Sequence, residues 1–178
     1  MINKLVTASL VAIIISVVFY CNYETPIAQK ERIFTFKGWR NSYNLTPDII
    51  ESDAHNAYIE IYLNEKAKMP YIDILPKFPV GSELYKPLYS DIEGKEFARL
   101  VIMVKMYKGY DSKNGDWWYG VSDESGEELY YEGKIPECIN CHMLARETDY
   151  LFARSVMKKL QGIDTNEFEE YLPDDEDY

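Results

Sequence analysis

The chain has 178 residues, a formal net charge of −11 and a pI near 4.7. Hydrophobic residues make up 47% and charged residues 28%, which is a globular composition and neither a disordered nor a collagen-like one. The acidic balance argues against a nucleic-acid binder, which needs a basic surface, and against adhesion to anionic membranes. Three Cys and two His are too few for a disulfide scaffold or an all-protein zinc site.

The N-terminus has the pattern of a targeting segment. Lys4 precedes an apolar run from Leu5 to Tyr20, which is typical of export and shorter than the ~20 residues that a comfortable membrane span needs. No small residues mark a cleavage site before Cys21, so a cleaved signal, an uncleaved anchor and a lipidated Cys21 stay open. We predict a signal peptide or N-terminal membrane anchor over 1–21, a linker over 22–31 and a periplasmic or otherwise extracytoplasmic domain. Its membrane contact is expected only through this N-terminal segment.

The middle of the chain predicts short strands separated by turn residues. An extended, β-favouring segment is expected over 58–64 and a strand over 83–89. Because proline restricts the residue before it, Pro87 places Lys86 on extended backbone, which we expect at a sheet edge. Further strands are predicted at 97–107, 117–121 and 127–132, joined by turns at Asn114-Gly115 and Ser125-Gly126.

The character of the chain changes after Gly133. Apolar residues recur at helical spacing over 148–160, and Gly162 ends that predicted helix. Residues 164–178 form an acidic C-terminal tail, expected to be solvated. The predicted fold class is α+β and mainly β, with an antiparallel β-sheet.

One motif carries the chemistry. Cys138, Cys141 and His142 form the Cys-x-x-Cys-His pattern of c-type haem attachment. Two cysteines at this spacing reach two vinyl groups of one porphyrin, and the adjacent histidine offers Nε2 to the iron. The alternatives are a redox Cys pair, which lacks its βαβ context, and half a zinc site, which lacks further ligands. We therefore predict one covalently attached haem c.

The second axial position of the iron decides between functions. An electron carrier needs a second strong ligand, often methionine, whereas an open position allows binding or chemistry. Met143 adjoins His142 and cannot reach the opposite face, while Met103 belongs to a predicted strand core. We expect five-coordinate iron with His142 as its axial ligand.

Several stretches together resemble the cytochrome P-460 family, which includes the cytochromes c′-beta. They are Gly109-Tyr110-Asp111, 114–119, Gly133-Lys134, 138–142 and 148–152, with 55–62 and 78–82 upstream. The resemblance runs from about Trp39 to Met157, and we place the haem domain at 32–163. It implies an antiparallel sheet with helices carrying a C-terminal haem site, five-coordinate iron and a homodimer.

The same resemblance implies a role for Lys86. In the hydroxylamine-oxidising members a lysine nitrogen is bonded to a meso carbon of the porphyrin, and that position falls on Lys86. The c′-beta members lack this bond and bind nitric oxide or carbon monoxide. Pro87 departs from the pattern, because a residue with a free backbone N–H is expected there.

Distal residues are harder to predict. Oxidation of hydroxylamine releases protons, so a carboxylate near the iron would serve as a base; Glu132 is preferred over Glu127, Glu128 and Glu137. His55 matches a position near the family's haem pocket and is a second distal candidate. The aromatic residues expected to line the haem are Trp117, Trp118, Tyr130 and Tyr131.

Three functions stay open from the sequence. The first is oxidation of hydroxylamine or a related nitrogen oxide, with a redox partner protein that could dock on the acidic surface. The second is binding of nitric oxide or carbon monoxide as a small gas ligand. The third is simple electron transfer, which would require His55 or a methionine on the iron.

Overall fold

The computed structural model describes residues 34–166, 168 and 171, and the elements below belong to a compact unit that begins at Thr35. The predicted signal or anchor over 1–21 and the linker over 22–31 lie outside the described residues. Within the described part, no helix combines the length and the apolar character that crossing a membrane requires.

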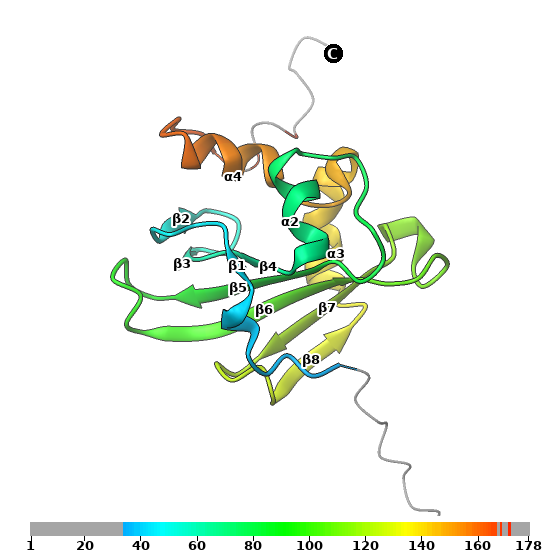
Figure 1. The fold of residues 1–178 in the computed structure, drawn as a ribbon, viewed down its shortest axis with the longest axis horizontal. Helices are drawn as coiled ribbons and strands as arrows, with labels where there is room; N and C mark the ends of the chain where they lie inside the picture. Colours follow the sequence, from blue (N-terminus) through cyan, green and yellow to red (C-terminus); the bar gives the residue numbers. More distant parts are fainter. Residues whose placement is uncertain (1–33, 167, 169–170, 172–178) are drawn as a thin grey trace, which may run out of the picture. The chain divides into compact units, whose positions relative to one another are not determined.

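An eight-stranded antiparallel sheet is the scaffold (Figure 1). Its strands follow the order β1-β4-β5-β6-β7-β8, while β2 pairs with β3 and β3 pairs with β5. The strands are β1 (Tyr43–Asn44), β2 (Ile50–Ser52), β3 (Ala57–Ile59), β4 (Tyr62–Leu63), β5 (Glu83–Tyr89), β6 (Phe97–Lys105), β7 (Trp117–Ser122) and β8 (Leu129–Gly133). The predicted α+β, mainly β class is confirmed.

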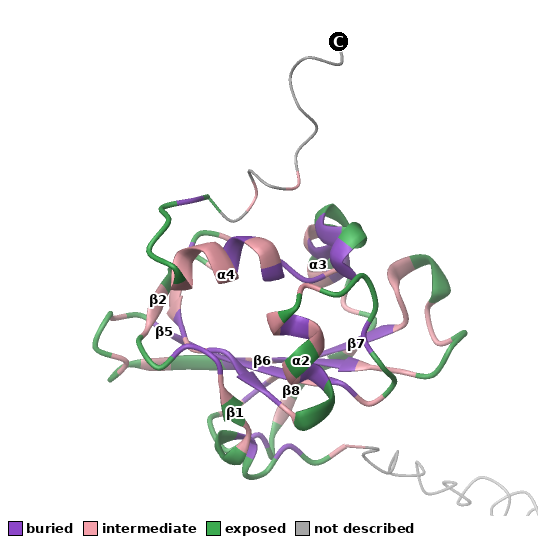
Figure 2. Cartoon of the chain, turned by 45° about the horizontal axis from the view of Figure 1, so that its top comes forward, coloured by how far each residue is buried: buried purple, intermediate pink, exposed green. Residues whose placement is uncertain are grey.

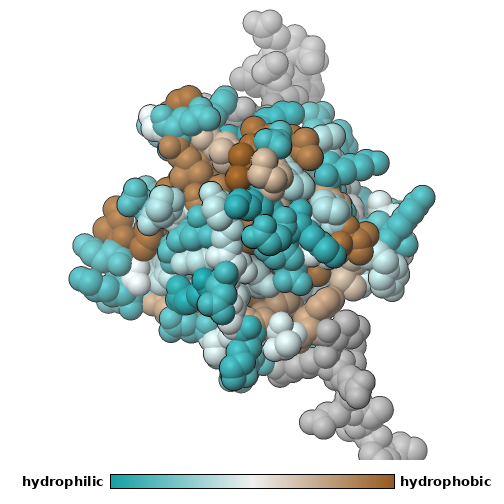
Figure 3. Space-filling model, in the orientation of Figure 1, coloured by the Kyte–Doolittle hydropathy of each residue, from teal (hydrophilic) through white to brown (hydrophobic). Residues whose placement is uncertain are grey.

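Three α-helices lie over one face of the sheet, as Figures 1 and 2 both show. They are α2 (Glu65–Ile72), α3 (Pro136–His142) and α4 (Ala153–Leu160), with short 3-10 turns η1 (Trp39–Asn41), η2 (Ser112–Asn114) and η3 (Met143–Thr148). Buried side chains of the central strands, among them Leu88 and Trp117, join Val156 of α4 in one core. β5 and β7 are therefore almost wholly buried (purple in Figure 2), whereas the first residues of β6 are partly or fully exposed. Hydrophilic residues dominate the face in Figure 3.

The opposite face of the sheet is covered by the N-terminal part of the unit. The ring of Phe36 lies 5.5 Å from that of Trp118, and the ring of Trp39 lies 5.0 Å from that of Tyr62. Trp39 Nε1 also donates to the Glu124 carbonyl at 2.9 Å. Trp118 therefore packs away from the helices, because alternate residues of β7 point to opposite faces.

The prediction that Lys86 lies at a sheet edge is wrong. β5 pairs with β6 on one side and with β4 and β3 on the other. Pro87 is tolerated because it falls between the β4 and β3 pairings, where no ladder bond is required of it. There Ile61 pairs elsewhere: its N–H donates to Thr46 Oγ1 and its carbonyl accepts from the N–H of Leu45, both at 2.8 Å.

The helices depart further from the sequence expectation. α2 was not predicted, although its cap is visible in the sequence: Asn64 Oδ1 accepts from the N–H of Ala67 at 3.0 Å. Pro70 within it obscures the helical pattern. The predicted helix over 148–160 begins only at Ala153, because Asp149 and Tyr150 adopt left-handed backbone angles that end η3.

The predicted acidic tail is not wholly solvated. Its described residues Phe168 and Tyr171 pack their rings 5.6 and 5.1 Å from that of Phe152. Tyr171 Oη also accepts from the N–H of Arg154 at 3.2 Å. Aromatic burial thus binds the start of this segment to the domain.

Candidate haem site

A cavity of about 230 Å³ lies between the helix-covered face of the sheet and α3. The wall from β5, β6 and β7 is mainly apolar, and the α3 wall carries the Cys-x-x-Cys-His motif. The lining residues that matter below are Leu84, Lys86, Arg99, Val101, Met103, Tyr119, Val121, Glu137, Cys138, Cys141, His142 and Phe152, with His55 from the turn between β2 and β3.

The two thiols lie on one short helix. Pro136 begins α3, where its fixed φ suits the first turn. Cys138 and Cys141 are three residues apart, so their side chains share one face of the helix; neither forms a disulfide, and both are partly exposed. Burial, with the nearby Glu137 carboxylate, raises the pKa of Cys138 to about 11. Both thiols line one cavity.

His142 is held in a defined orientation. Its ring is buried, and Nδ1 lies 2.6 Å from the carbonyl oxygen of Tyr150. A carbonyl only accepts, so Nδ1–H donates and Nε2 is left with a lone pair. Burial, together with the positive charge of Lys86, lowers the pKa of His142 to about 4. The imidazole is therefore neutral at neutral pH, which is the state that ligates a metal.

This pKa predicts acid sensitivity of the chain produced without haem. The folded pKa is depressed, so between about 4 and about 6.5 the unfolded chain binds a proton that the folded chain does not. The free energy of unfolding should fall by roughly 3 kcal/mol over that window from this group alone. Urea unfolding of wild type and His142→Gln at several pH values measures it. Equal pH slopes for the two proteins would refute the effect.

Lys86 and His55 are both in the cavity wall. Lys86 is only 8% exposed and lies on the same face of β5 as the core residues Leu84 and Leu88. His55 is half-buried; burial, and then the positive charge of Lys86, lowers its pKa well below the usual value. The structure thus brings together both basic residues that the sequence singled out with the haem motif.

The structure does not bring Glu132, the preferred distal base, to this cavity. This residue is exposed on β8 and is absent from the cavity lining. Glu132 pairs with Gly120, which alternates with Tyr119 along β7, so its side chain leaves the sheet on the face opposite to that of Tyr119. The carboxylate that lines the cavity is Glu137, directly before Cys138 on α3.

The aromatic lining also differs from expectation. Tyr130 and Tyr131 are 53% and 67% exposed, and Trp118 packs on the far face of the sheet. Tyr119 and Phe152 line the cavity instead, each with its ring 5.5 Å from that of His142. Strand alternation could have identified Tyr119, because it shares a face with the buried Trp117.

The donor set fits a covalently attached haem. Two thiols, a neutral buried imidazole with its Nε2 lone pair, and an apolar wall surround one space. The Tyr119 hydroxyl, on a side chain only 2% exposed, has no hydrogen-bond partner among the described residues. A buried hydroxyl without a partner costs free energy, so this one is suited to an occupant of the cavity.

Comparison with known proteins agrees with this geometry. Residues 36–153 match the family model of cytochrome P460. The chain belongs to the cytochrome P460 family. A search of curated proteins found no match. The resemblance drawn from the sequence is confirmed, and this cytochrome P460 is a haem c protein of the P460 kind.

Proposed function

We propose that this cytochrome P460 is exported, carries one covalently bound haem c and oxidises hydroxylamine or a related small nitrogen oxide. The thiols of Cys138 and Cys141 would hold the porphyrin through thioethers, and His142 Nε2 would bind its iron. The group supplies a redox-active iron with an exchangeable coordination position. The observation that carries the proposal is the burial of Lys86 in the wall of the same cavity.

The burial of Lys86 sets its amine apart from an ordinary surface lysine, whose ammonium stays in water. Lys86 lies on a strand paired on both sides, so its amine is held on the cavity face of the sheet. This placement supports a bond from Lys86 Nζ to a porphyrin carbon. Such a bond would replace one N–H of Lys86 and one porphyrin C–H, and a two-electron oxidant such as hydrogen peroxide would take up the two electrons and two protons and become water.

The remaining polar groups support proton handling. Oxidation of hydroxylamine releases protons, and a base within reach of the substrate assists their removal. His55, with its depressed pKa, is a neutral imidazole at neutral pH and can accept a proton. Glu137 is the carboxylate in the wall. The electrons leave to an external one-electron acceptor, such as another redox protein.

Turnover of the haem-loaded protein tests this function. With hydroxylamine and ferricyanide as one-electron acceptor, we expect reduction of ferricyanide that depends on both hydroxylamine and the protein. The same chain produced without haem is the control and should be inactive. Full haem loading with no rate above that control would exclude hydroxylamine oxidation.

Gas binding is a second function with an observation in its favour. Most of the sheet wall is apolar, including Leu84, Val101 and Val121, and Glu132 is not part of the cavity. Such a pocket suits nitric oxide or carbon monoxide. Carbon monoxide binding to the reduced protein, without hydroxylamine turnover, would favour this function over the enzyme.

A further inference from the structure

We propose that the ion pair between Lys105 and Asp149 is a positioning device for His142. The pair holds a strained turn whose carbonyl fixes the imidazole of the axial ligand. The inference rests on the proposed function in one respect, the role of His142 as ligand of the haem iron. It does not depend on the substrate or on a bond to Lys86.

The turn that carries the carbonyl is unusual. Asp149 and Tyr150 have φ angles of 53° and 68°. Residues other than glycine rarely adopt this region, and two in succession persist only where their surroundings hold them. The Tyr150 carbonyl, which accepts from His142 Nδ1 at 2.6 Å, belongs to this strained segment.

Asp149 is held from three other parts of the fold. Its carboxylate accepts from Lys105 Nζ, at 2.6 Å to Oδ1 and 2.5 Å to Oδ2, and from the N–H of Phe78 at 2.7 Å. Its main-chain carbonyl accepts from Trp117 Nε1 at 2.8 Å. The side chains of Lys105 and Asp149 are 12% and 7% exposed, so water screens the pair little.

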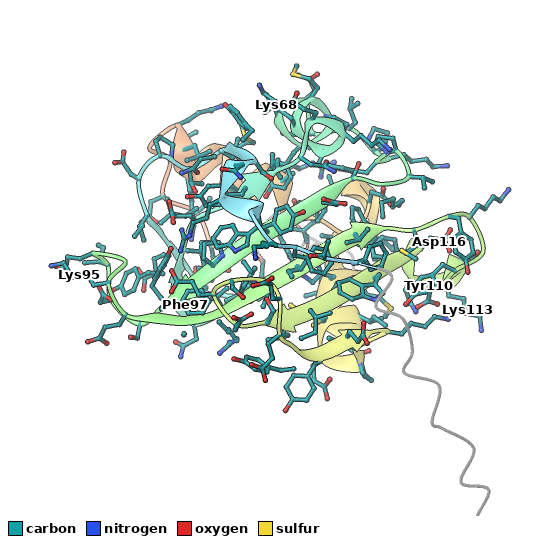
Figure 4. All side chains as sticks on the ribbon, turned by 60° about the horizontal axis from the view of Figure 1, so that its bottom comes forward. Lys68, Lys95, Phe97, Tyr110, Lys113 and Asp116 are labelled. Atoms are coloured by element: carbon teal, nitrogen blue, oxygen red, sulfur yellow. The ribbon has the colours of Figure 1, made fainter. Side chains whose placement is uncertain are left out.

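Tyr150 is fixed separately. Its N–H donates to the Ala145 carbonyl at 2.7 Å, and its hydroxyl donates to the Lys113 carbonyl at 3.0 Å. A side chain at Gly115 would collide with the Tyr150 ring, and Gly115 has φ 74°. Figure 4 shows this loop, with Lys113 and Asp116 labelled together at one end of the sheet. The position of the Tyr150 carbonyl is thus fixed both by the contacts of Asp149 and by those of Tyr150 itself.

The chemical consequence concerns the strength of the axial ligand. A fixed acceptor on Nδ1–H orients the ring and raises the basicity of Nε2. If the turn relaxes, the acceptor moves or exchanges with water. The bond between Nε2 and iron should then weaken and become heterogeneous. The ion pair acts through Tyr150 and touches neither the iron nor the substrate.

The test uses haem-loaded wild type, Asp149→Asn and Lys105→Met. Asparagine tolerates left-handed angles, so D149N removes the charge and keeps the backbone preference. The readout is the iron–histidine stretching band in the resonance Raman spectrum of the reduced protein. We expect both variants to shift this band to lower frequency and broaden it at unchanged haem content. The double variant should shift it no further than the larger single shift, because the two residues act as one unit.

A matched control is Glu127→Gln, which breaks the exposed pair Lys37–Glu127 at 3.1 Å and should leave the band unchanged. If D149N does not fold, the Raman band of K105M alone tests the proposal, because K105M leaves intact the hydrogen bond from the Phe78 N–H to the Asp149 carboxylate. If the iron–histidine band of both variants has the same position and width as that of the wild type, the inference is overturned. Absence of an iron–histidine band in five-coordinate wild type would instead overturn the assignment of His142.

Discussion

Lys86→Met should lower hydroxylamine oxidation about a hundredfold or more while haem content stays at the wild-type level. Loss of one preorganised group from a reactive site typically has an effect of roughly this size. Methionine has a similar length but no amine, so no bond to the porphyrin can form. The optical spectrum of the variant should become that of an ordinary high-spin haem c. Steady-state rates and the reduced spectrum measure both effects.

The matched control for this variant is Lys95→Met. Lys95 is an exposed lysine in the turn between β5 and β6 (Figure 4), far along the hairpin from the cavity wall. It should change neither the spectrum nor the rate. Wild-type activity and spectrum in Lys86→Met would refute the role of the lysine.

In a Lys86→Met background, where no bond from Lys86 to the porphyrin can form, replacing both Cys138 and Cys141 with serine should abolish covalent haem completely. Serine hydroxyls do not form thioethers with vinyl groups, and the remaining axial ligand cannot retain haem in denaturant. Each single variant keeps one thiol and should keep part of the covalent haem. Haem staining of a denaturing gel distinguishes the variants.

The third cysteine provides the control for that experiment. Cys21 lies outside the motif, and Cys21→Ser should stain like the wild type. A double cysteine variant in the Lys86→Met background that still carries haem after denaturation would contradict attachment through α3. Loss of stain in the double variant alone would support it.

The strands were largely predictable because their patterns are local. The apolar run that predicts a strand over 97–107 corresponds to β6 at Phe97–Lys105, and the turn at Asn114-Gly115 precedes β7. The position of β5 was not predictable. A proline in a strand normally indicates a sheet edge. Pro87 is tolerated in the sheet interior because the backbone of Ile61 forms its hydrogen bonds with Thr46 and Leu45 instead of with β5.

The candidate site was predictable where spacing alone determines chemistry. Cys138, Cys141 and His142 form a contiguous motif, and all three line the cavity. The expectation that Glu132 lies near the iron could not be checked from the sequence, because it depends on which face of β8 the side chain occupies. The carbonyl that orients His142 was beyond sequence reasoning, because the left-handed angle of Tyr150 is a product of packing against distant segments.

The optical spectrum of the reduced, haem-loaded protein tests the central claim most directly. A strongly red-shifted and broadened Soret band is the predicted result, because a bond from Lys86 changes the conjugation of the porphyrin. An ordinary high-spin haem c spectrum would contradict that bond and favour gas binding. A sharp six-coordinate, low-spin spectrum would contradict the open iron position altogether, with Met103 or His55, which both line the cavity, as the second ligand.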